Sequence, residues 1–230
     1  MIKIENVGVY GWEAAIRGMR NPMNSWSKSD SSYFYSESSY PHSGEFVHIG
    51  KNDLVLMKSL IKAGSDHRKF LRFINVTCDI TAPLYWWKEF DTYKVGTVRN
   101  SCSTMHTIAK KEFTLDDFSI EHIEPIDFIY VDALSYSDCS GIDNWTLAKL
   151  IVEVLNFNRK KYLETKGKWY WWQMIQLLPS SYNQRATVQL NYEVLMKMYH
   201  ERKNHKLDEW NDFCEWVKTL PYMRELLNDG

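Results

Sequence analysis

One stretch near the end of the chain, residues 178–210, constrains the fold more than any other. After a Leu-Pro pair and a polar segment, it becomes a single helical pattern. Residues on one side of that helix recur at spacings of four, three and four: Asn191, Leu195, Met198 and Arg202. An amide and a guanidinium about three turns apart suit a phosphorylated ligand lying along a groove, because a guanidinium presents a rigid fork to phosphate. An exposed helix with a solvated arginine gives the same pattern, so both interpretations stay open.

Composition limits the class of protein. The chain has 230 residues, of which 44% are hydrophobic, and this is enough for one sizeable core. We expect a single domain spanning residues 1–230. Lys and Arg total 28 against 29 Asp and Glu, so the basic excess of a non-specific nucleic-acid binder is missing. The sequence therefore predicts no nucleic-acid partner.

The four cysteines are scattered, without the paired spacing of a zinc site, so we expect no metal and reduced thiols. The N-terminus is too short and polar for a signal peptide. No run of residues approaches the roughly 18 apolar positions of a membrane span. The sequence predicts a cytoplasmic protein without a membrane segment.

Apolar periodicity and turn residues predict the elements of the N-terminal half. Residues 22–45 are rich in Ser, Tyr and Asn, and we expect a long loop or a lid over a pocket. Asn52 is the expected N-cap of the helix that follows. The expected elements are a strand over 1–9, helices over 11–19 and 52–63, a strand over 70–80 and a helix over 82–93.

The C-terminal half is expected to be mainly helical. Residues 94–108 form a polar turn and a short extended piece, which suits a polar ligand or is an ordinary loop. The helix expected over 145–163 should bury one face, formed by Leu147, Leu150, Ile151, Val154, Leu155 and Phe157. The other expected elements are a connecting stretch over 110–143, a helix over 169–178, a strand or an extended crossing over 182–189, and a last helix over 208–227 that is interrupted near Pro221.

Common catalytic motifs are missing. The sequence has no Walker or Rossmann glycine loop and no nucleophile elbow. Cys102 with His106 would allow a nucleophilic thiol, but four residues of separation are a poor guide to a catalytic pair. His67 is either a site residue or a structural histidine.

Two stretches together carry a family pattern. The first is Asp66-His67, an apolar strand, Ala82-Pro83, and then Asn100-x-x-Ser103. The second is Leu178-Pro179, an asparagine thirteen residues after that leucine, and an arginine eleven residues further on, which are Asn191 and Arg202. In this order and spacing they resemble the flavin-dependent thymidylate synthases, the ThyX family.

The chain departs from the family signature RHRxxSxNxxSxRY at several positions. Thr92-Tyr93-Lys94 stand in place of Arg-His-Arg, Met105-His106 in place of Arg-Tyr, and Ser101 in place of a glutamate. The arginine expected just before Leu178 is also missing. Each lost charge-assisted bond is worth about 1.5–3 kcal/mol, so the loss of several would nearly abolish binding in the family's usual pose.

The resemblance implies an α+β fold, with a mixed or antiparallel sheet packed against long helices, and a pocket shared between the subunits of a homotetramer. It implies FAD as cofactor, NADPH and methylenetetrahydrofolate as co-substrates, and transfer of a one-carbon unit to dUMP or a related pyrimidine nucleotide. The cofactor carries the hard chemistry in such an enzyme. The polar turn near residue 100 and the guanidinium of Arg202 must then meet in one cavity.

The same resemblance assigns roles to Asn191, Arg202, Ser103, Lys94 and Asn100, and other polar residues of the sequence are added to the expected site. We expect Arg202 and Ser103 at the catalytic centre. The expected flavin contacts are Asn191, His67, Lys94 and Asn100, and the expected nucleotide contacts are Arg202, Ser103, Ser101, Glu89 and Arg185. Two other interpretations stay open: a non-catalytic nucleotide-binding or sequestering protein on this fold, and an aromatic-rich interaction protein whose resemblance is accidental.

Overall fold

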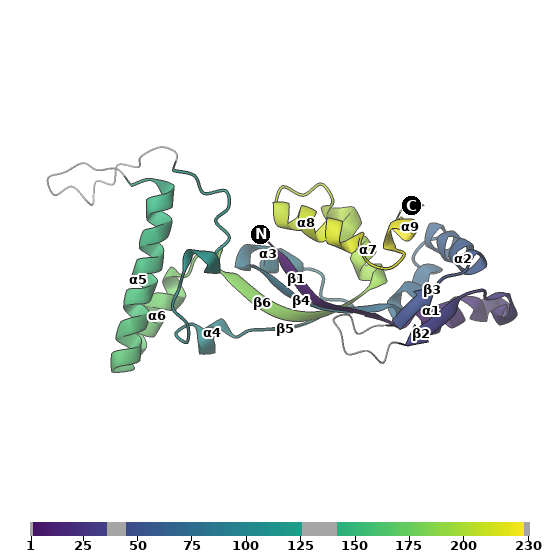
Figure 1. Ribbon diagram of the computed structural model, residues 1–230, viewed down its shortest axis with the longest axis horizontal. Coiled ribbons are helices and arrows are strands. Elements are labelled where there is room, and N and C mark those ends of the chain that lie inside the picture. The colour runs from purple at the N-terminus through teal and green to yellow at the C-terminus, as the bar shows by residue number, and fades with distance from the viewer. Residues whose placement is uncertain (1, 36–44, 126–141, 228–230) are drawn as a thin grey trace. The chain divides into compact units, whose positions relative to one another are not determined.

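The computed structural model describes residues 2–35, 45–125 and 142–227 (Figure 1). Contacts within the chain divide it into two compact units. The hairpin unit comprises Ala82–Trp87 and Cys102–Gln184, and the sheet unit comprises Ile2–Thr81, Lys88–Ser101 and Arg185–Gly230. The expectation of a single domain stays a prediction.

A four-stranded sheet has the strand order β1-β4-β6-β5. Strand β1 is antiparallel to β4, and β5 is antiparallel to β6. The register of β1 shifts between Glu5 and Gly8, where Asn6 has a φ of 53°. The strands are β1 (Lys3–Tyr10), β4 (Asn75–Pro83), β5 (Val98–Ser101) and β6 (Asn183–Asn191).

Buried and more exposed residues alternate along β4 and β6, so the sheet has one covered face and one open face. Within the sheet unit, α7 (Tyr192–Arg202) and α8 (Asp208–Val217) lie over the covered face (Figure 1). A short last helix, α9 (Met223–Leu227), follows them. The buried strand residues are Val76, Cys78, Ile80, Ala186, Val188 and Leu190. The intervening polar residues face the opposite side, so the sheet has a polar open face.

The N-terminal elements correct the expectation of a structureless loop over 22–45. The stretch contains two short 3-10 turns, η1 (Asn21–Met23) and η2 (Trp26–Lys28), and a strand, β2 (Ser32–Tyr35), that pairs with β3 (Glu45–His48). Residues 36–44 lie outside the described part. A lid function for the segment stays a prediction.

A buried ion pair fixes part of this segment against α2 (Lys51–Lys62). Arg20, the last residue of α1 (Trp12–Arg20), donates from Nε to Asp53 Oδ1 at 2.6 Å, and both side chains are almost completely buried. Asp53 Oδ2 also accepts from the hydroxyls of Ser29 and Ser31 and from the backbone of Asp30. The carboxylate is therefore hydrogen-bonded at both oxygens, as a buried charge requires.

The same region shows why the expected N-cap of α2 was wrong. Gly50 precedes the helix, and the carboxylate of Asp30 accepts from the backbone of Asn52 and Asp53 at 2.9 and 3.1 Å. A carboxylate from a distant part of the chain thus satisfies the free N–H groups. No local pattern around Asn52 indicates this arrangement.

Two further boundaries differ from the expectation. The strand expected to begin at Phe70 begins at Asn75, because the preceding residues form a 3-10 helix, η3 (Arg68–Phe73). The helix expected over 82–93 is α3 (Leu84–Phe90), since Ala82 and Pro83 still belong to β4.

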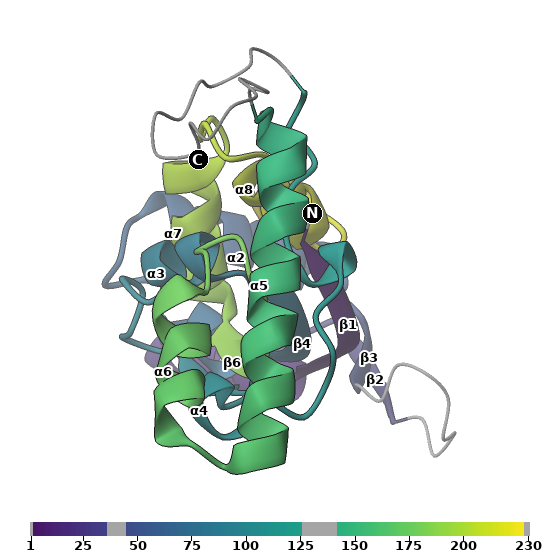
Figure 2. The same cartoon turned by 90° about the vertical axis from the view of Figure 1, so that its left-hand side faces the viewer.

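The hairpin unit is built on two helices, α5 (Asn144–Thr165) and α6 (Lys168–Leu177), which lie side by side (Figure 2). Asp143 caps α5 by accepting from the backbone of Thr146 at 2.6 Å. Two short elements, α4 (Thr104–Thr107) and η4 (Leu115–Asp117), precede them. A small core joins these pieces, made of Ile108, Phe113, Phe118, Leu155 and Met174.

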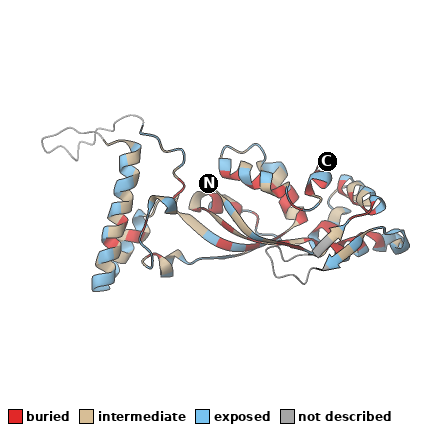
Figure 3. Cartoon of the chain, viewed as in Figure 1, coloured by how far each residue is buried: buried red, intermediate tan, exposed pale blue. Residues whose placement is uncertain are grey.

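The expectation of a buried face on α5 is wrong for this single chain. Only Leu155 and Asn158 are buried along its 22 residues, which are mostly half-buried or exposed (Figure 3). Leu147 and Leu150 are each 42% exposed, and Phe157 is 59% exposed. The reason is that α6 and the segment around Phe118 cover only part of the helix. Among the described residues, no helix combines the length and hydrophobicity needed to cross a bilayer.

Candidate functional site

A segment of the sheet unit, residues 88–97, lies along α7 in the reverse direction. Near the start of α7, a Cβ atom built on Gly96 would lie 2.9 Å from Asn191 Nδ2. Near its end, the guanidinium carbon of Arg202 lies 5.6 Å from the centre of the Tyr93 ring. Parts of the two stretches that carry the family resemblance therefore meet in the structure.

Arg202 is held by specific contacts at the end of α7. Its Nε donates to the hydroxyl of Tyr93 at 2.8 Å, and its Nη1 donates to Glu89 Oε2 at 2.7 Å. The guanidinium carbon also lies 4.9 Å from the ring centre of Trp210. A guanidinium above two rings gains cation–π stabilisation, and the two hydrogen bonds fix its plane. The solvated arginine that the sequence left open is thus excluded, since the side chain is only 18% exposed.

The carboxylate of Glu89 is contacted by three side chains, all at one oxygen. Its Oε2 accepts from Arg202 Nη1 and from Trp210 Nε1, the latter at 3.1 Å, and it lies 3.2 Å from His205 Nε2. His205 Nδ1 accepts from the backbone of Leu207, so the ring proton of the neutral form lies on Nε2, facing the carboxylate. The network therefore combines a carboxylate, a guanidinium, an imidazole and an indole.

The hydroxyl of Tyr93 connects this network to Glu201, the residue that precedes Arg202 in α7. It accepts from Arg202 and donates to Glu201 Oε2 at 2.8 Å. Burial raises the pKa of Tyr93 above its ordinary value; Arg202 opposes this rise and Glu201 adds to it. Tyr93 thus stays protonated near neutral pH and acts as a positioning group for Arg202.

The other end of the segment is a tight turn against Asn191. Gly96 has a φ of 80°, which favours glycine, and Thr97 donates from its backbone to Lys94 O. Asn191 Oδ1 caps α7 by accepting from the backbone of Val194 at 3.0 Å. In the described part of the chain, the amide nitrogen of Asn191 has no acceptor and the buried hydroxyl of Thr97 has no partner. The turn therefore has an unpaired amide nitrogen and a buried, unpaired hydroxyl.

The open face of the sheet holds a second polar cluster around Asp79. Its carboxylate accepts from Thr187 Oγ1 at 2.5 Å, Asn6 Nδ2 at 2.7 Å and Arg185 Nη2 at 2.8 Å. These bonds, that from Thr187 first, lower the pKa of Asp79 to about 2. Asn100 is the cross-strand partner of Thr187, so strand pleating places it on this face too. Asn100 and Arg185 are thus on the opposite face of the sheet from α7, and their expected ligand roles stay predictions.

The remaining expected site residues are exposed. His67 follows the turn at Gly64 and donates from its backbone to Gly64 O. Ser101 lies at the end of β5. Ser103 caps α4 by accepting from the backbone of His106. Since Ser103 belongs to the hairpin unit and Arg202 to the sheet unit, their expected convergence stays a prediction.

Sequence reasoning missed three members of the Arg202 network: Tyr93, His205 and Trp210. Tyr93 was visible only as a departure from the family signature, and it lies beyond the end of α3 at Phe90. Trp210 gave none, since a completely buried tryptophan is expected in any core.

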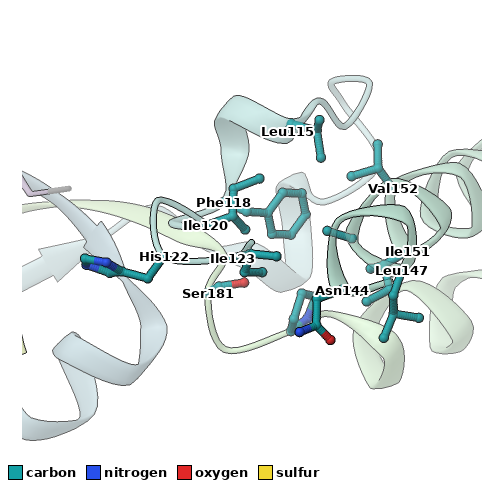
Figure 4. Close-up of a pocket in the computed structure, with 12 residues that line it drawn as sticks. Leu115, Phe118, Ile120, His122, Ile123, Asn144, Leu147, Ile151, Val152 and Ser181 are labelled. Carbon is teal, nitrogen blue, oxygen red and sulfur yellow. The ribbon is translucent and has the colours of Figure 1, made fainter. Parts of the chain in front are cut away.

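An apolar cavity of about 350 Å³ lies in the hairpin unit (Figure 4). Phe118 and Ile151 are among the residues that line it, and Asn144 and Ser181 add polar atoms. Of the described residues that line this cavity, none is an expected site residue. We therefore place the candidate site at α7 and the segment 88–97.

No protein-family model and no curated protein sequence matches this chain. Solved structures do match it. Thymidylate synthase X (ThyX) from Helicobacter pylori with FAD and dUMP matches with a TM-score of 0.64 at 15% identity, over 100% of this chain and 98% of that chain. The UMP/dUMP methylase PolB from Streptomyces cacaoi, bound with 5-Br dUMP, matches with a TM-score of 0.62 at 12% identity, over 100% of this chain and 94% of that chain.

These matches define the class of fold. The chain has the α+β fold of the flavin-dependent thymidylate synthases, as the sequence resemblance implied. Both similar proteins hold a uracil nucleotide on this fold, and the Helicobacter pylori protein also holds FAD. At these identities the likeness establishes the fold alone.

Proposed function

We propose that this chain is a divergent relative of the flavin-dependent thymidylate synthases and transfers a one-carbon unit to a pyrimidine deoxynucleotide, dUMP or a related one. The observation that carries the proposal is the contact between Glu89 and Arg202. Both residues are expected nucleotide contacts, and Arg202 Nη1 lies 2.7 Å from Glu89 Oε2 at the end of α7. A fold matched over its whole length to two nucleotide-binding proteins supports the same conclusion.

The turn at Gly96 fits a flavin. A flavin ring presents carbonyl and ring-nitrogen acceptors at its edge, together with one N–H donor. The amide nitrogen of Asn191 is a matching donor, and it has no acceptor among the described residues. We assign Asn191 and Lys94 to hold FAD, with its pyrophosphate attracted by the lysine.

When bound, FAD supplies the redox chemistry of the transfer, with NADPH and methylenetetrahydrofolate as co-substrates. The residues of the chain bind and orient. Arg202 donates hydrogen bonds to the nucleotide from a guanidinium whose plane Tyr93 and Glu89 fix. Trp210 closes the inner side of this network and excludes water, since it is fully buried.

The exposed apolar surface of α5 and α6 supports self-association, and we include a homotetramer in the proposal. Leu150, Phe157 and Leu163 on α5 and Trp169 and Trp172 on α6 are all more than 40% exposed. Large apolar side chains gathered on one helix pair are typical of protein–protein contact surfaces. A mass of four chains in solution is the expected result.

A second candidate function is binding without catalysis, as a nucleotide sensor or a sequestering protein. It is favoured by the pairing of Arg202 with an internal carboxylate, which neutralises a charge that the family uses on its ligand. Both candidate functions require nucleotide binding, and only the enzyme converts the bound nucleotide to a product.

The absorbance spectrum and activity of the purified protein test the proposal. We expect a flavin band near 450 nm and a rise in melting temperature with FAD, since ligand at 100 times Kd adds about 2.7 kcal/mol. Product from dUMP, methylenetetrahydrofolate and NADPH, lost in Arg202→Ala while FAD binding is unchanged, supports the enzyme. Binding of FAD and nucleotide without turnover supports the second candidate. A folded protein that binds neither ligand excludes both.

A further inference from the structure

The Glu89–Arg202 pair leaves one acceptor and one donor uncommitted. All three donors that reach Glu89 reach Oε2, and among the described residues none reaches Oε1. Arg202 uses Nε and Nη1, and in the same part of the chain its Nη2 has no acceptor. The Glu89 side chain is 34% exposed and that of Arg202 is 18% exposed, so neither side chain is completely buried.

The uncommitted oxygen of Glu89 and the uncommitted nitrogen of Arg202 have opposite hydrogen-bonding roles. A carboxylate oxygen only accepts hydrogen bonds and a guanidinium nitrogen only donates them. The contacts with Trp210 and Tyr93 hold both groups in place, so the acceptor and the donor keep their positions. The pair therefore presents an acceptor beside a donor, and it suits a base edge that presents a donor beside an acceptor.

Cytosine and uracil differ in this edge. Cytosine presents an amino group at C4, followed by acceptors at N3 and O2, while uracil presents an acceptor at O4, a donor at N3 and an acceptor at O2. With cytosine, Glu89 Oε1 accepts from the amino group and Arg202 Nη2 donates to N3, so neighbouring donor and acceptor groups of the base are both paired. With uracil, Glu89 accepts from N3–H but then lies beside a carbonyl oxygen that it repels. A glutamine would avoid this, because an amide both donates and accepts.

We propose that Glu89 and Arg202 select a cytosine nucleotide over a uracil nucleotide. The inference rests on the proposed function and names the base that this site takes. It differs from what the similar structures hold, since those contain dUMP or bromo-substituted uracil nucleotides. The carboxylate at position 89 carries the expected preference for cytosine.

Binding of dCMP and dUMP to the full-length protein, with and without saturating FAD, tests the inference by calorimetry. A single well-placed base contact discriminates by about 1–3 kcal/mol, so wild type should bind dCMP about tenfold tighter than dUMP or more. Glu89→Gln should lose this preference, with dUMP binding as tightly as dCMP. Asp91→Asn is the matched control: it removes one carboxylate close in sequence, one that pairs with Arg99 instead, and should keep the preference.

Wild-type protein alone also decides the question, should Glu89→Gln fail to fold. The 2-pyrimidinone deoxynucleotide lacks the amino group and keeps N3 and O2, so it should bind about tenfold more weakly than dCMP. Equal binding of dCMP and dUMP by wild type, or tighter dUMP, overturns the selection and leaves the proposed function standing. Binding of no pyrimidine nucleotide by the folded protein overturns both.

Discussion

The backbone of Gly96 packs directly against the side chain of Asn191: a methyl group there would come within 2.9 Å of Nδ2 and 3.0 Å of Val194 Cγ2. Gly96→Ala should therefore push the turn away from α7 and weaken FAD binding. The positive φ adds strain of about 1–2 kcal/mol. Urea unfolding and flavin titration measure the two effects.

Gly64→Ala is a matched control for that variant. Gly64 also has a positive φ, of 103°, and a Cβ atom there meets nothing within 4 Å. Its replacement should cost similar stability through the backbone and leave flavin affinity unchanged. Equal loss of flavin binding in both variants would contradict a role for the turn.

The buried pair Arg20–Asp53 should stabilise the N-terminal segment strongly. Asp53→Ala leaves the guanidinium buried without its partner, and we expect a loss of about 3–5 kcal/mol in the free energy of unfolding. Arg17→Ala, which removes an exposed contact with Glu13, should cost less than about 1 kcal/mol. Chemical denaturation of both variants checks the difference, and similar values would contradict the burial argument.

The lowered pKa of Asp79 predicts that the protein loses stability in acid. The pKa of Asp79 in the folded state is about 2, below the ordinary value of about 3.9, so its contribution is full well above about pH 4 and is lost as the pH falls through about 2. Asp79→Asn should cost about 1–2 kcal/mol near neutral pH and much less at about pH 2. Thr187→Val removes the bond that lowers the pKa most, so NMR titration of the Asp79 carboxyl carbon should give a higher pKa in that variant.

The cysteines should differ in reactivity. Burial raises the pKa of Cys78 to about 12 and that of Cys214 to about 11, whereas Cys102 is exposed. The thiolate is the reactive form, and at pH 8 about one Cys78 in ten thousand carries it. Peptide mapping after brief iodoacetamide treatment should find Cys102 modified, and Cys78 and Cys214 modified only in urea. Cys139 lies outside the described residues.

The sequence predicted best where the pattern was long and local. The helix ending at Arg202, the strand before it and the helix that became α5 all have the expected type, because apolar period and flanking turn residues are read directly from the chain. The fold class followed from spacing between motifs, and the structural matches confirm it.

The predictions from sequence failed where residues distant in the chain determine the local structure. Asp30 caps α2 from 22 positions away, and no local rule identifies such a partner. Apolar spacing on α5 predicted a buried face, but period alone does not say what covers a helix, and Leu147 and Leu150 stay exposed here. In the site, Glu89 and Arg202 were expected to share a ligand, while the contact between them, over 113 positions, appeared only in the structure.

Asn191 ends β6 and caps α7 with no connecting residue between strand and helix. An N-cap is worth about 1 kcal/mol by itself, so the requirement to fold preserves this amide even when nothing binds to it. A relative that has lost its chemistry would therefore keep the asparagine for as long as it keeps its shape. Its presence identifies a chain that folds in this way, and an active member of the group must be recognised at other positions.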